Sequence, residues 1–225
     1  MNVFGPLFIW HIGPLAINAD IVIQWFVMLF LIVLLGGLAT TFKVENPGKI
    51  QCILEMIYEY ISDLVDSNMG LDFHGYVPFV GTLFLFLFML DCLGLIGFGP
   101  PTRNLSVVIG FTVIAILIIH GTAIKRKGVG RYFKGFIHPY AAMLPLNIME
   151  AIVFPLSLCL RLWGNMLAAA IVMSLVYKWL YSIAWVAQIG FPIMPHSFFD
   201  LFDGALQTVI FVMLVVINIK LEVEH

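Results

Sequence analysis

The chain has 225 residues, of which 62% are hydrophobic and only 11% charged, and its formal net charge is −2. A composition this apolar, with hydrophobic runs of about twenty residues, excludes an ordinary soluble domain and indicates an integral membrane protein, and the small net charge argues against a nucleic-acid surface. The three cysteines, Cys52, Cys92 and Cys159, are too widely spaced to suggest a disulfide framework or a metal site, so no metal or cofactor is expected.

The first half of the chain predicts three membrane spans and one amphipathic helix. Residues 1–20 are apolar but broken by glycine and proline, and we expect a short segment at the outer surface rather than a cleaved signal peptide. Spans are expected at 21–42, 77–98 and 105–124. Between the first two, residues 47–69 repeat apolar side chains at helical spacing opposite an acidic face, so this helix is expected to lie in the membrane plane.

Two ionisable residues within these spans each allow a structural and a functional interpretation. Asp91 is either a carboxylate held by a neighbouring helix or a polar lining of an ion path. His120, near the end of its span, fits an interfacial or hydrogen-bonded group better than a proton relay.

The second half of the chain predicts two long helices, 142–178 and 196–220, that form a hairpin. Within the first, a helix from Leu146 to Lys178 would approach 50 Å at about 1.5 Å per residue, which exceeds a hydrocarbon core of about 30 Å. It must therefore tilt, bend or break, and Pro155 is the expected bend. The predicted fold class is an all-α membrane protein that forms a single domain over 1–225, with about five transmembrane helices, the in-plane helix and a tilted hairpin.

Basic residues predict the orientation of the chain. Because cytoplasmic loops carry an excess of Lys and Arg, the basic loop after the third span is expected in the cytoplasm. Counting the spans from there places the N-terminus outside and the C-terminus inside. The loop holds five of the eleven Lys and Arg residues, namely Lys125, Arg126, Lys127, Arg131 and Lys134.

Polar side chains lie along one face of each hairpin helix. When the helices are projected at about 100° per residue, the polar residues of the first helix fall within a sector of roughly 80° and those of the last helix within a sector of roughly 60°. Hydrogen bonds between helices would account for amides and hydroxyls, but poorly for a lone arginine and three carboxylates. The first stripe consists of Asn147, Glu150, Ser157, Arg161 and Asn165, and the second of Asp200, Asp203, Gln207 and Asn218.

These stripes predict an ion path with a charge barrier. Arg161 lies near mid-depth, Glu150 near the inner end of its helix, and Asp200 and Asp203 near the outer end of theirs. Arginine stays protonated, so Arg161 cannot relay a proton, but it can hold a carboxylate ionised and repel a passing cation. Any moving carboxylate must then lie on a partner.

The residues around Arg161 resemble a known family. RLWGNM is similar to the RLFGNM signature of the subunit a family of F-type ATP synthases, the membrane stator against which the c-ring rotates, and Gln207 matches the glutamine of the family's last helix. The resemblance covers nearly the whole chain. Its other matching segments are NPGKIQCILEMIYEYI, YVPFVGTLFLFLFMLDCLGLIG, PLSLCLRLWGN and the terminal VEH.

The resemblance implies a function and a set of partners. It implies a non-catalytic stator subunit that carries protons or sodium ions through two offset half-channels to and from the c-ring carboxylates, with Arg161 facing the ring. Asn165 and Gln207 would flank Arg161, and Glu150 would lie on the cytoplasmic exit path. The implied partners are the c-ring, the peripheral-stalk b subunits, other ATP synthase subunits and lipid. The topology with the N-terminus outside and the C-terminus inside favours the plasma membrane of a bacterium over an organelle.

The chain departs from the family pattern at two positions. Ala170 stands where the family often has Glu or His, and Asp200 stands where it often has His or another polar group. Relative to the family pattern, an acid is thus exchanged between the two helices, and we expect Asp200, assisted by Asp203, to supply the outer carboxylate if the positions face each other.

Other function classes fit the sequence less well. A self-contained secondary transporter or channel is the main alternative, but internal repeats are missing. A hydrolase would need a paired-His metal motif or a Gly-x-Ser-x-Gly elbow, and neither is present. The sequence also lacks a nucleotide-binding loop, so any linked ATP chemistry belongs to other chains.

Overall fold

The fold is a bundle of long helices, seen in a computed structural model that describes residues 9–12, 15–40, 42–43, 48–96, 99–135, 144–183 and 192–224. A short antiparallel hairpin precedes it, in which Ile9 pairs with Asn18 and Ile12 with Leu15. In chain order the elements are β1 (Ile9–Ile12), β2 (Leu15–Asn18), α1 (Ala19–Ala39), α2 (Lys49–Met69), η1 (Leu71–Tyr76), α3 (Val77–Cys92), η2 (Leu93–Ile96), η3 (Pro101–Arg103), α4 (Leu105–Lys127), α5 (Val129–Gly135), α6 (Leu144–Ile183), α8 (Ile193–His196), η5 (Ser197–Asp203) and α9 (Gly204–Glu224).

The helices confirm the predicted all-α membrane class. Helices are the natural spanning structure because lipid offers no partners for backbone polar groups, which a helix satisfies internally. The segments long and apolar enough to cross a membrane are Asp20–Ala39, Leu71–Leu95, Leu105–Lys127, Leu144–Ser182 and Ile193–Glu224.

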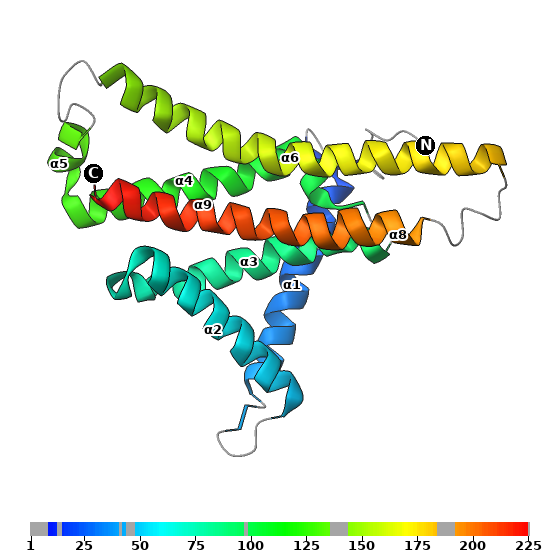
Figure 1. Ribbon diagram of the computed structural model, residues 1–225, viewed down its shortest axis with the longest axis horizontal. Coiled ribbons are helices and arrows are strands. Elements are labelled where there is room, and N and C mark those ends of the chain that lie inside the picture. Colours follow the sequence, from blue (N-terminus) through cyan, green and yellow to red (C-terminus); the bar gives the residue numbers. More distant parts are fainter. Residues whose placement is uncertain are drawn as a thin grey trace.

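Helix α9 is the centre of the bundle. It packs against α2, α3, α4 and α6, and Figure 1 shows it lying between α6 and α3. Its buried side chains recur every three or four residues, so they form one continuous packing stripe. They are Gly204, Gln207, Thr208, Phe211, Val212, Val215, Val216 and Ile219.

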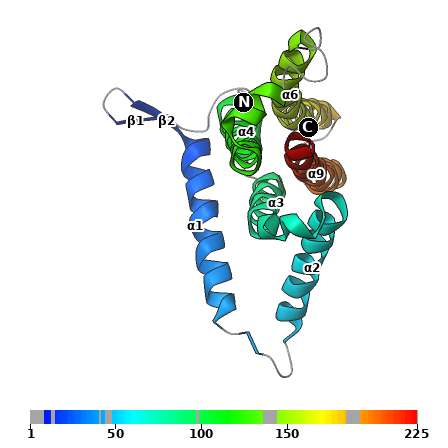
Figure 2. The same cartoon turned by 90° about the vertical axis from the view of Figure 1, so that its left-hand side faces the viewer.

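The bundle runs at a steep angle to α1. Figure 2 shows α3, α4, α6 and α9 nearly end-on while α1 and α2 are seen along their length. Helix α6 has 40 residues. It is thus about 60 Å long, and it fits a hydrocarbon layer of about 30 Å only when inclined roughly 60° from the membrane normal. Helix α1 has 21 residues and matches the layer when it crosses directly.

Helix α6 bends without breaking. It runs continuously from Leu144 to Ile183 and bends in its first half, where Pro155 lies inside the helix (Figure 1). Proline removes one backbone donor and crowds the preceding turn, which is the usual cause of such a bend.

Helix α2 is amphipathic, as its sequence indicates. Ile61, Val65 and Met69 are buried, whereas Glu55 and Glu59 are exposed. The helix ends at Gly70, whose φ of 92° favours glycine. The described helix begins at Lys49, and the expected start at residues 46–47 lies outside the described residues.

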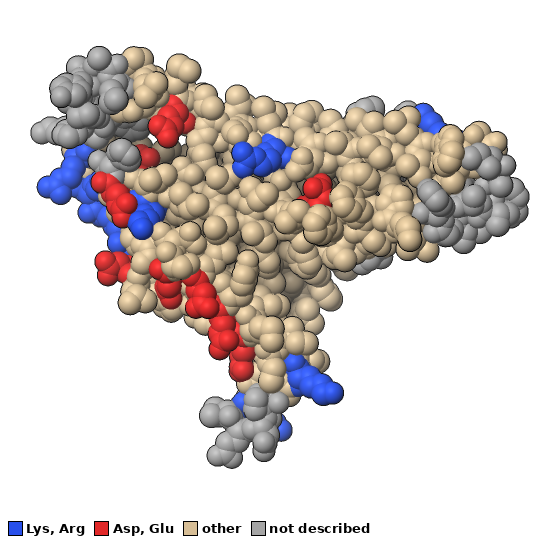
Figure 3. All heavy atoms as spheres, viewed as in Figure 1, with Lys and Arg blue, Asp and Glu red and all other residues tan. Residues whose placement is uncertain are grey.

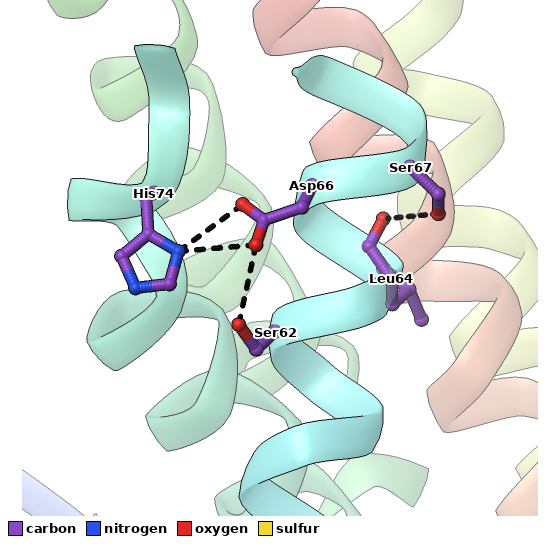
Figure 4. Close-up of polar contacts among 5 residues, drawn as sticks. All are labelled: Ser62, Leu64, Asp66, Ser67 and His74. Atoms are coloured by element: carbon purple, nitrogen blue, oxygen red, sulfur yellow. Dashed lines mark hydrogen bonds and ion pairs between the residues drawn. The ribbon is translucent and has the colours of Figure 1, made fainter. Parts of the chain in front are cut away.

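The segment after α2 folds back onto it through a histidine and a carboxylate. His74 Nδ1 in η1 lies 3.1 Å and 3.2 Å from the two carboxylate oxygens of Asp66, and Ser62 Oγ donates to the same carboxylate over 3.3 Å (Figure 4).

Replacing Phe211 with Ala should destabilise the bundle, because its side chain is 0% exposed. In lipid or detergent the cavity term remains although the transfer term is small, so we expect a loss of about 2 kcal/mol. The midpoint of thermal unfolding in mild detergent measures this loss. The control is Phe202→Ala, since Phe202 is 55% exposed; equal shifts in both variants would contradict the packing of α9 at the centre.

Candidate ion path

The two predicted polar stripes meet at one hydrogen bond. Asn165 Nδ2 on α6 donates to Gln207 Oε1 on α9 over 2.9 Å. Gln207 is 2% exposed, and its Nε2 has no hydrogen-bond partner among the described residues. The bond fixes how α6 is rotated against α9. Beside the bond, the buried Nε2 of Gln207 keeps N–H donors that no described residue accepts.

Arg161 lies one helical turn before Asn165 and points away from the bundle. It is exposed and makes no hydrogen bond or ion pair with any residue in the described ranges. Helix α6 carries only two basic residues, Arg161 and Lys178, and the face of the molecule in Figure 3 is mostly neutral along the length of the hairpin, with few charged side chains. Because a charge in lipid costs at least about 2.5–3.5 kcal/mol, this surface requires a partner or water at Arg161.

The rest of the α6 stripe extends from Arg161 toward the end of the bundle that carries α5. Glu150 and Ser157 are exposed, and Asn147 is partly buried with a polar contact of its own. Glu150 stands eleven residues before Arg161, which is about 16 Å along a helix. The exposed polar groups therefore form a line along one side of α6.

The acidic residues of the second hairpin helix lie toward the opposite end, which carries α8. Asp200 is buried and Asp203 half-buried. The projection from the sequence assumed an α-helix, but residues Ser197–Asp203 form a π-helix. Its wider turn changes the angular spacing. Asp200 consequently lies against Gly94 of η2, where an added Cβ would come within 2.5 Å of the carboxyl carbon.

Asp91 is a third carboxylate of this region, and neighbouring segments hold it. Its side chain is 0% exposed and accepts hydrogen bonds from Thr102 Oγ1 over 2.9 Å and from Thr208 Oγ1 over 3.3 Å. Gly204 packs against its Cβ. Asp91 thus ties α3 to η3 and α9, and it interacts electrostatically with Asp200 and Asp203.

Sequence reasoning missed several polar groups at the α8 end. Thr102 and Thr208 carry no signal of their own because hydroxyls are common in apolar helices. His196, which contacts Asp200, stands four residues before it, so the helical spacing could have revealed this pair. Within the described residues, no group of three or more His, Cys, Asp or Glu side chains could hold a metal ion.

Comparison with known proteins shows the family to which the chain belongs. Residues 21–220 match the family described as ATP synthase A chain. The chain belongs to this family. The match confirms the resemblance seen around Arg161, and membership makes the chain a stator subunit of a rotary ATP synthase that conducts ions, with other ATP synthase subunits as its partners.

Two members of the ATP synthase A chain family illustrate the relationship. The chain is 35% identical over 175 residues to ATP synthase subunit a of Moorella thermoacetica, and the match covers 76% of this chain and 79% of the relative. It is 28% identical over 220 residues to the sodium ion specific ATP synthase subunit a of Propionigenium modestum, covering 91% and 73% respectively.

Replacing Asp91 with Leu should destabilise this member of the family, because the buried hydroxyls of Thr102 and Thr208 lose their acceptor. The expected loss is about 1–3 kcal/mol for each group left unsatisfied. Asp91→Asn is the matched control, since its carbonyl oxygen still accepts from one hydroxyl and its amide nitrogen can donate to the other. Thermal unfolding in mild detergent compares the two, and an equal loss of stability would show that the hydroxyl contacts do not matter.

Proposed function

We propose that the chain conducts ions through two half-channels that reach Arg161 from opposite ends of the hairpin and open toward the carboxylates of a c-ring. The single observation that carries the proposal is Arg161 itself, an exposed cation on an apolar face without a partner among the described residues. The polar groups on either side are displaced along the hairpin, so neither half alone crosses the membrane.

The charge of Arg161 gives the path its barrier. A guanidinium stays protonated at any accessible pH, so it does not relay protons. It stabilises the ionised form of a ring carboxylate that comes close, which releases the bound ion, and it repels a cation that would pass directly between the half-channels. Asn165 and Gln207 hold the adjacent turn of α6 in place through their hydrogen bond.

The half-channel at the α8 end would use Asp200, assisted by Asp203. These residues lie on the α8 side of Gln207, and Ala170 of α6 carries no acidic group. The half-channel at the α5 end would use the exposed Glu150 and Ser157 together with the partly buried Asn147. Each half thus has its own carboxylate, and Arg161 separates the two.

The proposed orientation places the α5 end in the cytoplasm of a bacterium. Basic side chains gather at this end (Figure 3), including Lys125, Arg126 and Lys127 in the last turn of α4. The described C-terminal end of α9 lies at the same end (Figure 1). Positive charge favours the cytoplasmic side of a plasma membrane, so the N-terminus would be outside and the α8 end would be the outer end.

Two exposed surfaces suit the proposed partners. The face of α6 around Arg161 suits the c-ring, because a moving carboxylate there would meet the cation. Helix α1 is almost entirely uncovered by the rest of the described chain, since only 6% of its apolar stretch is buried. It is therefore available to lipid and to the peripheral-stalk b subunits. The transported ion is a proton or sodium, and the dependence of pumping on sodium concentration distinguishes them.

Replacing Arg161 with Ala should abolish ATP-driven ion pumping in inverted membrane vesicles that contain the whole complex. The barrier between the half-channels is lost, so passive ion leak should rise as well. Lys178→Ala removes the other basic residue of α6 and serves as the control, with pumping expected to stay near the unmodified level. Pumping that survives in Arg161→Ala would refute the proposal.

Replacing Asp200 with Ala while keeping Asp203 should lower ATP synthesis driven by an imposed ion gradient. We expect a drop of at least roughly tenfold, the lower end of what a positioned proton-transfer group contributes. The control is Asp63→Ala, which removes an exposed carboxylate from α2. Unchanged coupling in Asp200→Ala would exclude this residue from the path.

A further inference from the structure

A hydrogen-bonded chain of three ionisable side chains joins the surface to Asp200. His196 Nδ1 lies 2.6 Å from Asp200 Oδ2, and His196 Nε2 lies 3.1 Å from the hydroxyl of Tyr177. Tyr177 comes from α6, whereas His196 and Asp200 come from the segment that leads into α9. The imidazole thus has both ring nitrogens engaged.

The exposure of the three groups decreases in order toward the interior. Tyr177 is exposed, the side chain of His196 is 30% exposed and that of Asp200 only 9%. In the part of the chain that the structure describes, His196 provides the one hydrogen bond to the Asp200 carboxylate. A group that touches water on one side and a buried carboxylate on the other can exchange protons between them.

Local structure holds this contact in place. His196 and Asp200 are four residues apart, and the helical backbone continues from α8 into η5. Gly94 provides the space for the carboxylate, since a Cβ there would meet all three carboxyl atoms of Asp200 within 2.7 Å. The carboxylate is therefore confined between a glycine and an imidazole.

We propose that His196 is the proton-exchanging residue at the mouth of the half-channel that Asp200 lines, so that the ion entering there is a proton. This inference rests on the proposed role of Asp200 and adds to it the group that supplies the proton. Histidine suits the task because it is the side chain whose charge ordinarily changes between pH 5 and 8.

The transfer itself is a simple proton exchange. The N–H bond at Nδ1 of the imidazolium breaks, its electron pair stays on the nitrogen, and the proton forms an O–H bond with Asp200 Oδ2. A hydronium ion of the outer water then reprotonates the ring and becomes water. Tyr177 keeps the ring oriented through Nε2.

Neighbouring ionisable groups act on the same pair. Tyr177 faces it from α6, Asp203 follows in η5, and Asp91 and Cys92 of α3 interact electrostatically with Asp200. The carboxylates among them attract a proton or a cation to this region.

The test compares His196 variants in vesicles that contain the whole complex. His196→Ala should reduce proton-driven ATP synthesis roughly tenfold at an outer pH of about 8 and less at about pH 6, where hydronium reaches Asp200 directly. Added imidazole should restore part of the rate. His196→Gln should be as slow as His196→Ala, because an amide can donate to Asp200 but cannot exchange a proton.

The matched control is His74→Ala, which breaks a His–Asp pair of similar chemistry between η1 and α2 (Figure 4). It should leave the rate and its pH profile unchanged, with or without imidazole. Recovery of the assembled complex after solubilisation in mild detergent shows that each variant assembles.

The outcomes separate this inference from the proposed function. Normal rates in His196→Gln, or a defect in His196→Ala that imidazole does not relieve, overturn the assignment of His196 alone when Asp200→Ala is still impaired. A normal Asp200→Ala overturns both. If ATP synthesis depends on the sodium concentration and not on the outer pH, the claim that a proton enters at this half-channel is overturned.

Discussion

The constraint around which the hairpin is built is a charge on an apolar helix face that no described residue compensates. Lipid does not stabilise the charge of Arg161, so the position of this residue must be held by the packed side of α6. Its buried side chains there are Leu158, Leu162 and Met166. The hydrogen bond between Asn165 and Gln207 completes this support. The helix is therefore fixed with its cation outward, ready to meet a charge that another subunit carries.

The length of α6 has a second consequence. A helix of 40 residues remains within a hydrocarbon layer only at a strong inclination, and the steep angle between the bundle and α1 agrees with this (Figures 1 and 2). An inclined hairpin presents a long lateral face instead of a short one. Polar groups that stand far apart along its axis can therefore lie at different depths while facing the same partner, which is what two separate half-channels require.

The α8 end of the bundle combines three carboxylates with unequal surroundings. Asp91 is enclosed by hydroxyls, Asp200 is held between Gly94 and His196, and Asp203 is half-buried. Like charges in a poorly hydrated region repel, so each needs its own compensating contact. Hydroxyls make Asp91 part of the scaffold, whereas the imidazole links Asp200 to water.

The sequence by itself determined the membrane class, the order of the long helices, the amphipathic character of α2 and the family, because apolar run length, helical periodicity and a local motif around Arg161 depend only on nearby residues. It also placed Asn165 and Gln207 in the polar stripes of the two hairpin helices, although it did not show that the stripes meet. Only the tertiary structure decided which side of α6 is uncovered, that Thr102 and Thr208 hold Asp91, and that a π-helix turns Asp200 toward Gly94. These contacts join residues far apart in the chain or depend on a local change of helix type, and an ideal helical projection contains neither.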